Sequence, residues 1–208
     1  LIVENMGDTP FSAFLDKAQT AALTAAAVRV REAVKIPIGI DAAFNDCEAS
    51  LAIAGIVGAD FIRVPVFVDT VLFTDGIIYP CVRKCMNFRK EMGLKHVKIL
   101  ADVQVKHATM LNPQITVEMS AKDAAGNGAD AIIVTGAVIG METPIDMLKR
   151  VQSVVHIPVL AGSGVNHKNI HEQLQIADGC IIGSSLKKDG ILANPIDYDL
   201  VREVVEAL

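Results

Sequence analysis

Short apolar runs rich in valine and isoleucine alternate along this chain with longer stretches in which apolar residues recur at helical spacing. This alternation is typical of βα units, in which a helix follows each strand of a parallel sheet. Folds built from hairpins show closely spaced strands and tight turns instead. The pattern therefore predicts an α/β fold, and a chain of 208 residues that is 51% hydrophobic can bury one sizeable core.

Seven apolar runs are predicted to be strands, at residues 1–4, 36–41, 61–67, 97–105, 131–135, 158–161 and 179–182. Helical periodicity is clearest between them, at residues 20–34, 47–57, 80–92, 117–126, 144–154 and 197–208. The triplet Gly-Ala-Asp occurs at residues 58–60 and again at 128–130, each time between a helix and the next strand. A glycine there ends the helix, and the small residue after it lets the chain turn.

The repetition of like units favours a (β/α)8 barrel, the TIM-barrel fold, over a doubly wound open sheet, although alternation alone fits both. A closed barrel of this kind has eight strands, whereas the chain supplies seven and opens on one of them at Leu1. We therefore expect a single domain over residues 1–208 that contains strands two to eight, with the first β/α unit missing. Such a barrel would expose two unpaired parallel edges.

Charge and hydropathy narrow the classes of partner. The formal net charge is -5 and aromatic residues make up only 4% of the chain, so nucleic acid is not an expected partner. The most apolar stretch, residues 21–28, is far shorter than the roughly 20 residues that cross a bilayer, so no membrane span is expected. We expect a soluble cytoplasmic protein that could form a homo-oligomer. An organelle such as the mitochondrion is the alternative if a targeting segment preceded Leu1.

Neither a metal site nor a cofactor is predicted. The four cysteines, Cys47, Cys81, Cys85 and Cys180, lack the paired spacing of a zinc site. Cys81 and Cys85 are one helical turn apart without a second pair, so we interpret them as free thiols on a helix. His167 and His171 also share helical spacing, but no glutamate follows His167, and a solvent-exposed helix face is the favoured interpretation.

Polar side chains collect at the carboxyl ends of the predicted strands. They are Glu4, Asn5, Asp41, Arg63, Asp102, Lys106, His107, Thr135 and Ser163. In a parallel barrel the loops converge at this rim, and active sites lie there. The carboxyl-terminal rim is therefore the expected ligand site.

Asp102 is the sharpest of these signals, because it interrupts an apolar strand in which a lone carboxylate needs a partner. Strand alternation predicts Lys106 on the same side. The two side chains could form an acid/base pair, or the amine could hold an anionic ligand. The structural alternative is a buried ion pair between Asp102 and Arg63 that only closes the barrel.

Two loops of small residues follow the last two predicted strands, and they read Gly162-Ser163-Gly164 and Gly183-Ser184-Ser185. Glycine lets backbone N–H groups approach an anion closely, serine adds a hydroxyl donor, and a short helix behind the loop presents its positive end. Many barrels bind phosphate at this place. The two loops together predict a phosphate site, with plain tight turns as the alternative.

Four segments resemble the BtpA/SgcQ family: LIVENMGDTPF at residues 1–11, ADFIRV at 59–64, KILADVQVKHA at 98–108 and ADGCIIGSSLK at 177–187. The similarity runs over nearly the whole chain, to residues 195–197. It implies a TIM barrel related to phosphate-binding barrels, with a strand and helix ahead of the first motif. The family takes its name from a cyanobacterial protein needed to accumulate photosystem I, yet similar proteins occur in organisms without photosynthesis.

Carried over by position, the resemblance points to Glu4, Asn5, Asp8, Arg63, Asp102, Lys106, His107, Gly162, Ser163, Gly164, Gly183 and Ser184. The family pattern would have asparagine at Asp41, arginine at Phe44 and asparagine at Pro65, and the loop at residues 74–80 lacks its Gln-Gly and Glu-Gly pairs. These departures gather around two neighbouring strands, so they bear on the substrate contacts of that side.

Three functions are compatible with these features. The first is an enzyme that acts on a phosphorylated small metabolite, a sugar phosphate or nucleotide derivative. Its catalytic candidates are Asp102, Lys106, Arg63 and Glu4, and its ligand-binding candidates are Gly162, Ser163, Gly164, Gly183, Ser184, Asn5, Asp41 and His107. The second is a non-catalytic assembly or biogenesis factor, of the photosystem I type in photosynthetic relatives, that uses the barrel exterior. The third is a structural barrel with vestigial loops.

Overall fold

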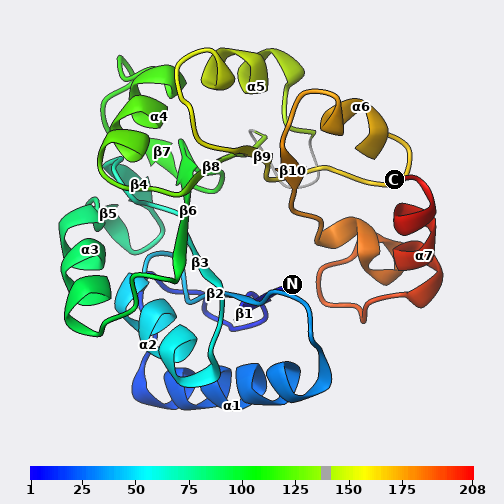
Figure 1. Ribbon diagram of the computed structural model, residues 1–208, viewed down its shortest axis with the longest axis horizontal. Coiled ribbons are helices and arrows are strands. Elements are labelled where there is room, and N and C mark those ends of the chain that lie inside the picture. Colours follow the sequence, from blue (N-terminus) through cyan, green and yellow to red (C-terminus); the bar gives the residue numbers. More distant parts are fainter. Residues whose placement is uncertain (137–141) are drawn as a thin grey trace.

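Seven parallel strands form a curled sheet in the computed structural model, which describes residues 1–136 and 142–208. Their order is β1 (Ile2–Glu4), β2 (Gly39–Asp41), β3 (Phe61–Val64), β6 (Lys98–Val103), β8 (Ala131–Val134), β9 (Val159–Ala161) and β10 (Gly179–Cys180). The strands surround a central axis and the helices lie outside them (Figure 1). This is the predicted barrel architecture, and β1 and β10 are its two outer strands, which do not pair with each other in the described residues.

Within the described residues, seven α-helices follow the strands or the loops between them. They are α1 (Lys17–Ala33), α2 (Cys47–Val57), α3 (Val82–Glu91), α4 (Val117–Gly126), α5 (Ile145–Gln152), α6 (Ile170–Leu174) and α7 (Tyr198–Glu206), and two single 3-10 turns, Ser184–Leu186 and Lys188–Gly190, follow β10. Local chemistry sets their ends. Asp16 accepts a hydrogen bond from the Gln19 N–H, and the Gln19 side-chain oxygen accepts one from the Asp16 N–H, which caps α1. Gly58 ends α2 with a φ of 64°.

The aspartates of the repeated triplets lock neighbouring strands together. Asp60 accepts a hydrogen bond from the Ile38 N–H and Asp130 from the Ile99 N–H, each at 2.9 Å. Asp178 accepts one from the Val159 N–H at 2.8 Å in the same way. Each carboxylate satisfies an N–H at the amino end of the adjacent strand, so the triplet sets register as well as turning the chain.

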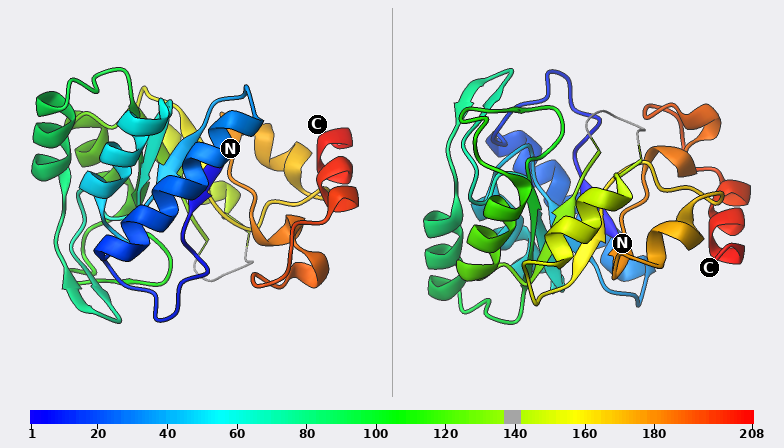
Figure 2. Two further views of the ribbon diagram at one scale, coloured as in Figure 1. Left: turned by 90° about the horizontal axis from the view of Figure 1, so that it is seen from below. Right: turned by 90° about the horizontal axis from the view of Figure 1, so that it is seen from above.

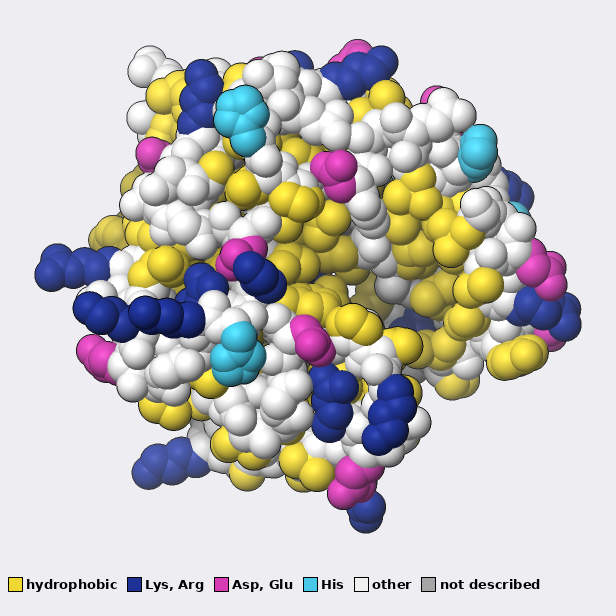
Figure 3. All heavy atoms as spheres, viewed as in Figure 1, with side chains coloured by type: hydrophobic (Ala, Val, Ile, Leu, Met, Phe, Trp, Pro, Cys, Tyr) yellow, Lys and Arg dark blue, Asp and Glu magenta, His cyan; other side chains and the backbone are white. Residues whose placement is uncertain are grey.

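The main core lies between the curled sheet and its helices. Ile40, Ile62, Ile99 and Ile132 are fully buried on consecutive strands. Each side chain of this size stabilises the fold by about 1.5–3 kcal/mol through burial. Figure 3 shows that one face of the molecule is hollowed near its centre, with hydrophobic side chains around the hollow and most charged ones farther out.

A small antiparallel sheet, which the sequence pattern did not predict, follows the ends of β3 and β6. It consists of β5 (Gly76–Ile78), β4 (Val71–Phe73) and β7 (Thr109–Met110) in that order. The predicted strands at residues 61–67 and 97–105 are therefore wrong at their ends. Pro65 follows the last residue of β3 and has no N–H for the ladder, and β6 stops before Gln104, whose φ is 48°.

Two phenylalanines from separate loops pack against Phe73 of β4 and hold this small sheet on the barrel. The rings of Phe44 and Phe73 stack at a centroid distance of 3.9 Å, and Phe11 meets Phe73 edge-on at 6.4 Å. Asp75 also accepts a hydrogen bond from the Ala13 N–H at 2.7 Å. The hairpin of β4 and β5 and the loop after β1 lie at the same end of the molecule (Figure 2), so they form a wall of the carboxyl-terminal rim.

Candidate functional site

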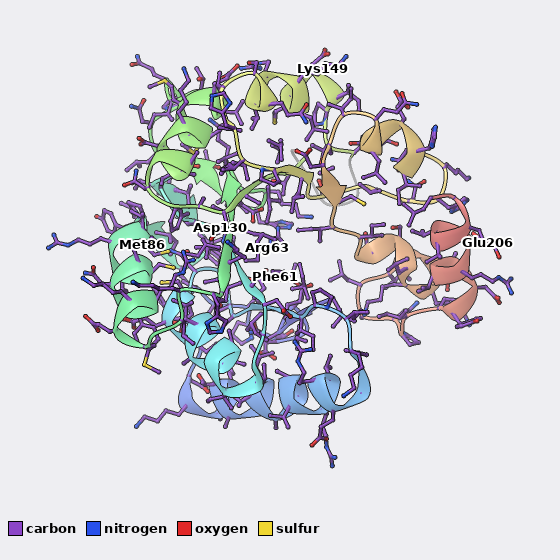
Figure 4. The ribbon with its side chains drawn as sticks, viewed as in Figure 1. Phe61, Arg63, Met86, Asp130, Lys149 and Glu206 are labelled. Atoms are coloured by element: carbon purple, nitrogen blue, oxygen red, sulfur yellow. The ribbon has the colours of Figure 1, made fainter. Side chains whose placement is uncertain are left out.

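Arg63 binds Asp102 at the centre of the rim. Its Nε and Nη2 donate to the two carboxylate oxygens of Asp102 at 2.8 and 2.9 Å, and its Nη1 lies 3.6 Å from Oδ2 of Asp41. The side chain of Asp102 is 0% exposed, that of Asp41 7% and that of Arg63 11%. Figure 4 labels Arg63 on the inner side of the curled sheet. The guanidinium of Arg63 thus lies within ion-pairing distance of two buried carboxyl groups.

Strand register explains why these groups meet. Glu4 and Asp41 are register partners at the ends of β1 and β2, and Arg63 lies on β3 beside them. Asp102 is level with Ile133 of β8. Because all the strands are parallel, their carboxyl ends share one rim, as predicted.

Burial leaves Asp41 in an unusual state. Loss of solvent, together with the nearby charges of Glu4 and Asp102, raises the pKa of Asp41 to about 8 against the opposing effect of Arg63. Its Oδ1 is buried and has no hydrogen-bond partner among the described residues. Asp41 is therefore a neutral carboxylic acid at neutral pH. For Arg63, burial disfavours the charge, but Asp102, Asp41 and Glu4 outweigh it and raise the pKa of the guanidinium.

Lys106 and His107 extend the cluster from the loop after β6. Partial burial, followed by the charge of Arg63, lowers the pKa of Lys106, while Asp102 and Glu4 act in the opposite direction. The pKa of His107 is lowered by burial, Lys106 and Arg63. Both groups thus release their protons more readily than they would in water.

Left-handed backbone conformations recur at this rim in residues other than glycine. Ala43, Gln104 and His107 have φ values of 53°, 48° and 70°. Asn5 accepts a hydrogen bond from the Ala43 N–H at 2.8 Å, and Asp69 accepts one from the Gln104 N–H at 2.8 Å. Such strain costs of order 1–3 kcal/mol per residue and gathers at functional sites.

The structure separates two predictions about Asp102. The predicted ion pair with Arg63 is present, with two direct hydrogen bonds. The alternation argument for Lys106 was wrong, because β6 ends at Val103 and Gln104 turns the chain. Lys106 still lies close enough to Asp102 for the two charges to interact, but no direct ion pair joins them among the described residues.

The loop after β9 is held mainly by its own packing. A Cβ on Gly162 would fall 2.5 Å from Cγ2 of Ile133, so glycine is required for the approach to β8. Ser163 is buried, and its hydroxyl accepts a hydrogen bond from the Gly136 N–H at 2.6 Å. Gly164 has a φ of 69°. The close packing and the left-handed turn account for both glycines without a ligand.

The loop after β10 differs from it. A Cβ on Gly183 would meet no atom within 4 Å. Among the described residues, the N–H groups of Gly183 and Ser184 have no hydrogen-bond acceptor. The sequence predicted that a short helix behind each loop presents its positive end to an anion. This contribution is weak, because Ser184 begins a single 3-10 turn and α6 has only five residues. The unpaired N–H groups are thus the donors that this loop offers.

Thr135 connects the charged cluster to the two small-residue loops. Its hydroxyl accepts a hydrogen bond from the Lys106 N–H at 3.2 Å, and a Cβ on Gly162 would fall 2.7 Å from its Cγ2. Ser185 in turn donates to the Val165 carbonyl at 2.6 Å, which joins the loop after β10 to the loop after β9. A continuous set of contacts therefore runs along the rim from Lys106 to Ser185.

Several buried polar residues of the rim were missed by sequence reasoning. Asp69 accepts from Ser120 at 2.6 Å, Asn45 accepts from the Val66 N–H at 3.2 Å, and Thr143 donates to the Ser163 carbonyl at 3.2 Å. Of these three, Asp69 and Asn45 follow apolar residues in the sequence, whereas Thr143 carries no comparable sequence signal. Asn5, a predicted ligand-binding residue, ties the loops after β1 and β2 together through hydrogen bonds to Asp8 and Ala43.

Other features lie away from this rim. A cavity of about 330 Å³ borders Pro158 and Asp178 at the amino ends of β9 and β10, and another of about 570 Å³ lies between Val82 and Gly128. Within residues 1–136 and 142–208, no group of three His, Cys, Asp or Glu side chains is arranged to hold a metal ion. None of the helices described there combines the length and apolarity needed to cross a membrane.

Comparison with known sequences decides the family. The sequence profile of the BtpA family matches residues 1–208. The chain belongs to the BtpA family. An uncharacterized protein of Methanocaldococcus jannaschii is 40% identical to it over 207 residues, which cover 99% of the chain and 77% of that protein. The photosystem I biogenesis protein BtpA of Synechocystis is 36% identical over 212 residues, which cover 100% of the chain and 73% of that protein.

Solved structures confirm the barrel fold. Thiamine phosphate pyrophosphorylase from Pyrococcus furiosus superposes with a TM-score of 0.63 at 15% identity, over 99% of this chain and 93% of that one. N-(5'-phosphoribosyl)anthranilate isomerase from the same organism gives 0.59 at 17% identity, over 99% and 86%. At these identities the likeness concerns the fold alone.

Proposed function

We propose that this BtpA-family barrel is an enzyme that acts on a phosphorylated small metabolite, a sugar phosphate or a nucleotide derivative. The observation that carries the proposal is the row of contacts from Lys106 through Thr135 to Gly162, which joins the buried charges to the loops after β9 and β10. The names of two barrels of similar fold refer to a phosphate compound and a phosphoribosyl compound, which is consistent with such a ligand.

The phosphate is assigned to the loop after β10. The N–H groups of Gly183 and Ser184 have no acceptor among the described residues, and backbone N–H groups of this kind bind phosphate oxygens. Ser163 contributes through its loop conformation, because its hydroxyl already accepts a hydrogen bond from Gly136.

Proton transfer is assigned to Asp41 and Lys106. Burial raises the pKa of Asp41 and lowers that of Lys106, so the carboxyl group can donate a proton while the amine can accept one. Asp102 is a positioning residue in this proposal, since both of its oxygens are engaged by Arg63. Glu4 and His107 border the same cluster.

Thermal-shift measurements test this function with a panel of sugar phosphates, nucleotides and inorganic phosphate. At 100 times its dissociation constant a ligand stabilises the folded state by about 2.7 kcal/mol, so a binding compound should raise the Tm by several degrees. Ser184→Asp should abolish the shift, since a carboxylate there repels the phosphate. Ser153→Asp, at the exposed end of α5, is the matched control. A panel without any shift, or a shift unchanged by Ser184→Asp, rejects the proposal.

A second candidate is a non-catalytic biogenesis factor, which the name of the 36% identical Synechocystis relative favours. It requires the barrel exterior and tolerates changes in the buried cluster. Complementation of a strain lacking that relative separates the two functions. Loss of function in Lys106→Ala at normal protein abundance supports the enzyme, and full function supports the biogenesis factor.

A further inference from the structure

Cys47 meets two cysteines that lie more than thirty positions later in the sequence, Cys81 and Cys85, beneath the wall of the rim. Cys47 is the first residue of α2, Cys81 is the residue before α3, and Cys85 lies one turn into α3. All three are at most 7% exposed and belong to the main core. The thiols of Cys81 and Cys85 are both within side-chain hydrogen-bonding reach of the Cys47 thiol.

An ion pair beside the cluster shows independently that the starts of the two helices adjoin. Nζ of Lys84, the neighbour of Cys85, lies 2.9 Å from a carboxylate oxygen of Glu48, the neighbour of Cys47. Behind them, Asn45 donates to the Tyr79 carbonyl at 3.3 Å. The segments that lead into α2 and α3 are therefore already in contact.

The environment distinguishes Cys47 from the other two thiols. It lies in the first turn of α2, where unpaired N–H groups favour a negative charge. The hydrogen bonds from Cys81 and Cys85, supported by the charge of Lys84, hold the pKa of Cys47 below its usual range, while those of Cys81 and Cys85 are raised. The lowered pKa makes Cys47 the thiol of the three that gives up its proton most readily.

We propose that Cys47 is an oxidation site, at which hydrogen peroxide leads to a reversible disulfide with Cys81. The Cys47 thiolate attacks one peroxide oxygen, the O–O bond breaks, and hydroxide leaves a sulfenic acid on the sulfur. The Cys81 sulfur then attacks the Cys47 sulfur, and the hydroxyl group departs as water with the thiol proton. The two sulfurs lose two electrons, and the peroxide becomes two molecules of water once the hydroxide is protonated.

Cys81 is the partner because it precedes the helix. The backbone of Cys85 lies inside α3, where its N–H donates to the Cys81 carbonyl at 2.8 Å, whereas the N–H of Cys81 makes only the longer hydrogen bond to the Val66 carbonyl at 3.3 Å. Peroxide is the oxidant because it is small enough to reach a sulfur of low exposure. The bond would tie the loop after β2, which follows Asp41, to the hairpin that follows Arg63.

Peptide mapping of the whole chain after peroxide treatment tests the proposal. Trypsin cuts after Lys35, Arg63, Arg83 and Lys84, so Cys47, Cys81 and Cys85 fall in the separate peptides 36–63, 64–83 and 85–89. Alkylation of the reduced chain should count four thiols, the number of free cysteines, and the oxidised chain should show two. The expected product is peptide 36–63 linked to 64–83, which a dithiol reductant should release.

Cys180 is the control within the chain. It is more exposed than Cys47, and burial raises its pKa, so Cys47 should react with peroxide at least about tenfold faster. Cys180→Ser and Cys85→Ser should still form the bond, and Cys47→Ser should not. Retention of all thiols, earlier oxidation of Cys180, or a link to peptide 85–89 would overturn the proposal. The map of the unmodified chain decides this even if a variant fails to fold.

Discussion

At the scale of single residues, the rim combines the ion pair of Arg63 and Asp102 with a carboxyl group, that of Asp41, which has a raised pKa. Arg63 holds both oxygens of Asp102, so these two charges offset each other in a place where either alone would be costly. Asp41 lies near only the third nitrogen of the same guanidinium, with 3.6 Å between its Oδ2 and Nη1 of Arg63. Burial therefore outweighs attraction at Asp41, and its proton is retained.

The pH dependence of stability should reveal this proton. The pKa of Asp41 is about 8 in the folded chain and 3.8 without burial, so the folded state binds the proton more tightly. The protonated carboxyl group of Asp41 contributes its full stabilisation below pH 3.8, the pKa in the unfolded chain. This stabilisation is lost as the pH rises through the folded-state pKa of about 8. The free energy of unfolding should fall by up to about 1.4 kcal/mol per pH unit in this window from Asp41 alone.

Urea unfolding between pH 5 and pH 8 measures this effect by comparing the chain with Asp41→Asn, which cannot titrate. The difference in slope between the two is the contribution of Asp41. Glu91→Gln, an exposed change on α3, should keep the slope of the unmodified chain. Equal slopes for the chain and Asp41→Asn would show that Asp41 is ionised throughout.

At the scale of elements, the loops after β9 and β10 are similar in sequence, but their glycines have different structural roles. Gly162 lies against β8, where an added Cβ would collide with Ile133 and Thr135, whereas Gly183 faces open space. The first glycine is required by packing. The second leaves the backbone N–H groups of its loop uncovered.

Alanine at each position separates the two roles. Gly162→Ala should lower the free energy of unfolding by about 1–3 kcal/mol, because overpacking displaces β8. Gly183→Ala should change it by less than about 0.5 kcal/mol while weakening any phosphate binding. Denaturant unfolding and the thermal-shift panel measure both. Similar stability losses in the two variants would contradict the assignment.

At the scale of the whole molecule, the curled sheet presents two outer strands. β1 and β10 end the strand order, and parallel edges of this kind invite association. We propose that an additional βα unit pairs with both and closes the barrel. The Synechocystis relative is matched over 73% of its length, so the remainder of that protein is long enough for such a unit, which takes about 30 residues.

A fusion tests this closure. The 208-residue chain alone should self-associate, whereas the chain fused to the part of the Synechocystis relative that lies outside the match should sediment as a smaller species. The fusion should also raise the Tm by several degrees, since it buries the edges. A fusion with proline in the middle of the added strand should give neither effect. Unchanged sedimentation and Tm in the intact fusion would count against an eighth strand.

Local signals in the sequence determined the order of the elements and most of their positions. The bounds of α2 and α4 agree with the prediction, because helical periodicity ends there at Gly58 and begins at a capping Thr116. The rim at which the polar residues collect was also predictable, since parallel strands place their carboxyl ends together. Each of these features depends on neighbours within a few residues.

Only the tertiary structure decided which polar groups become partners. Asp102 binds Arg63 rather than Lys106, because β3 lies next to β6 while Gln104 turns the chain out of the strand. Cys47 joins Cys81 and Cys85 because α2 packs against α3, and the small antiparallel sheet forms because two loops leave the same rim. Apart from the hairpin of β4 and β5, these contacts link residues more than thirty positions apart, and the local sequence pattern does not determine which of such distant residues meet.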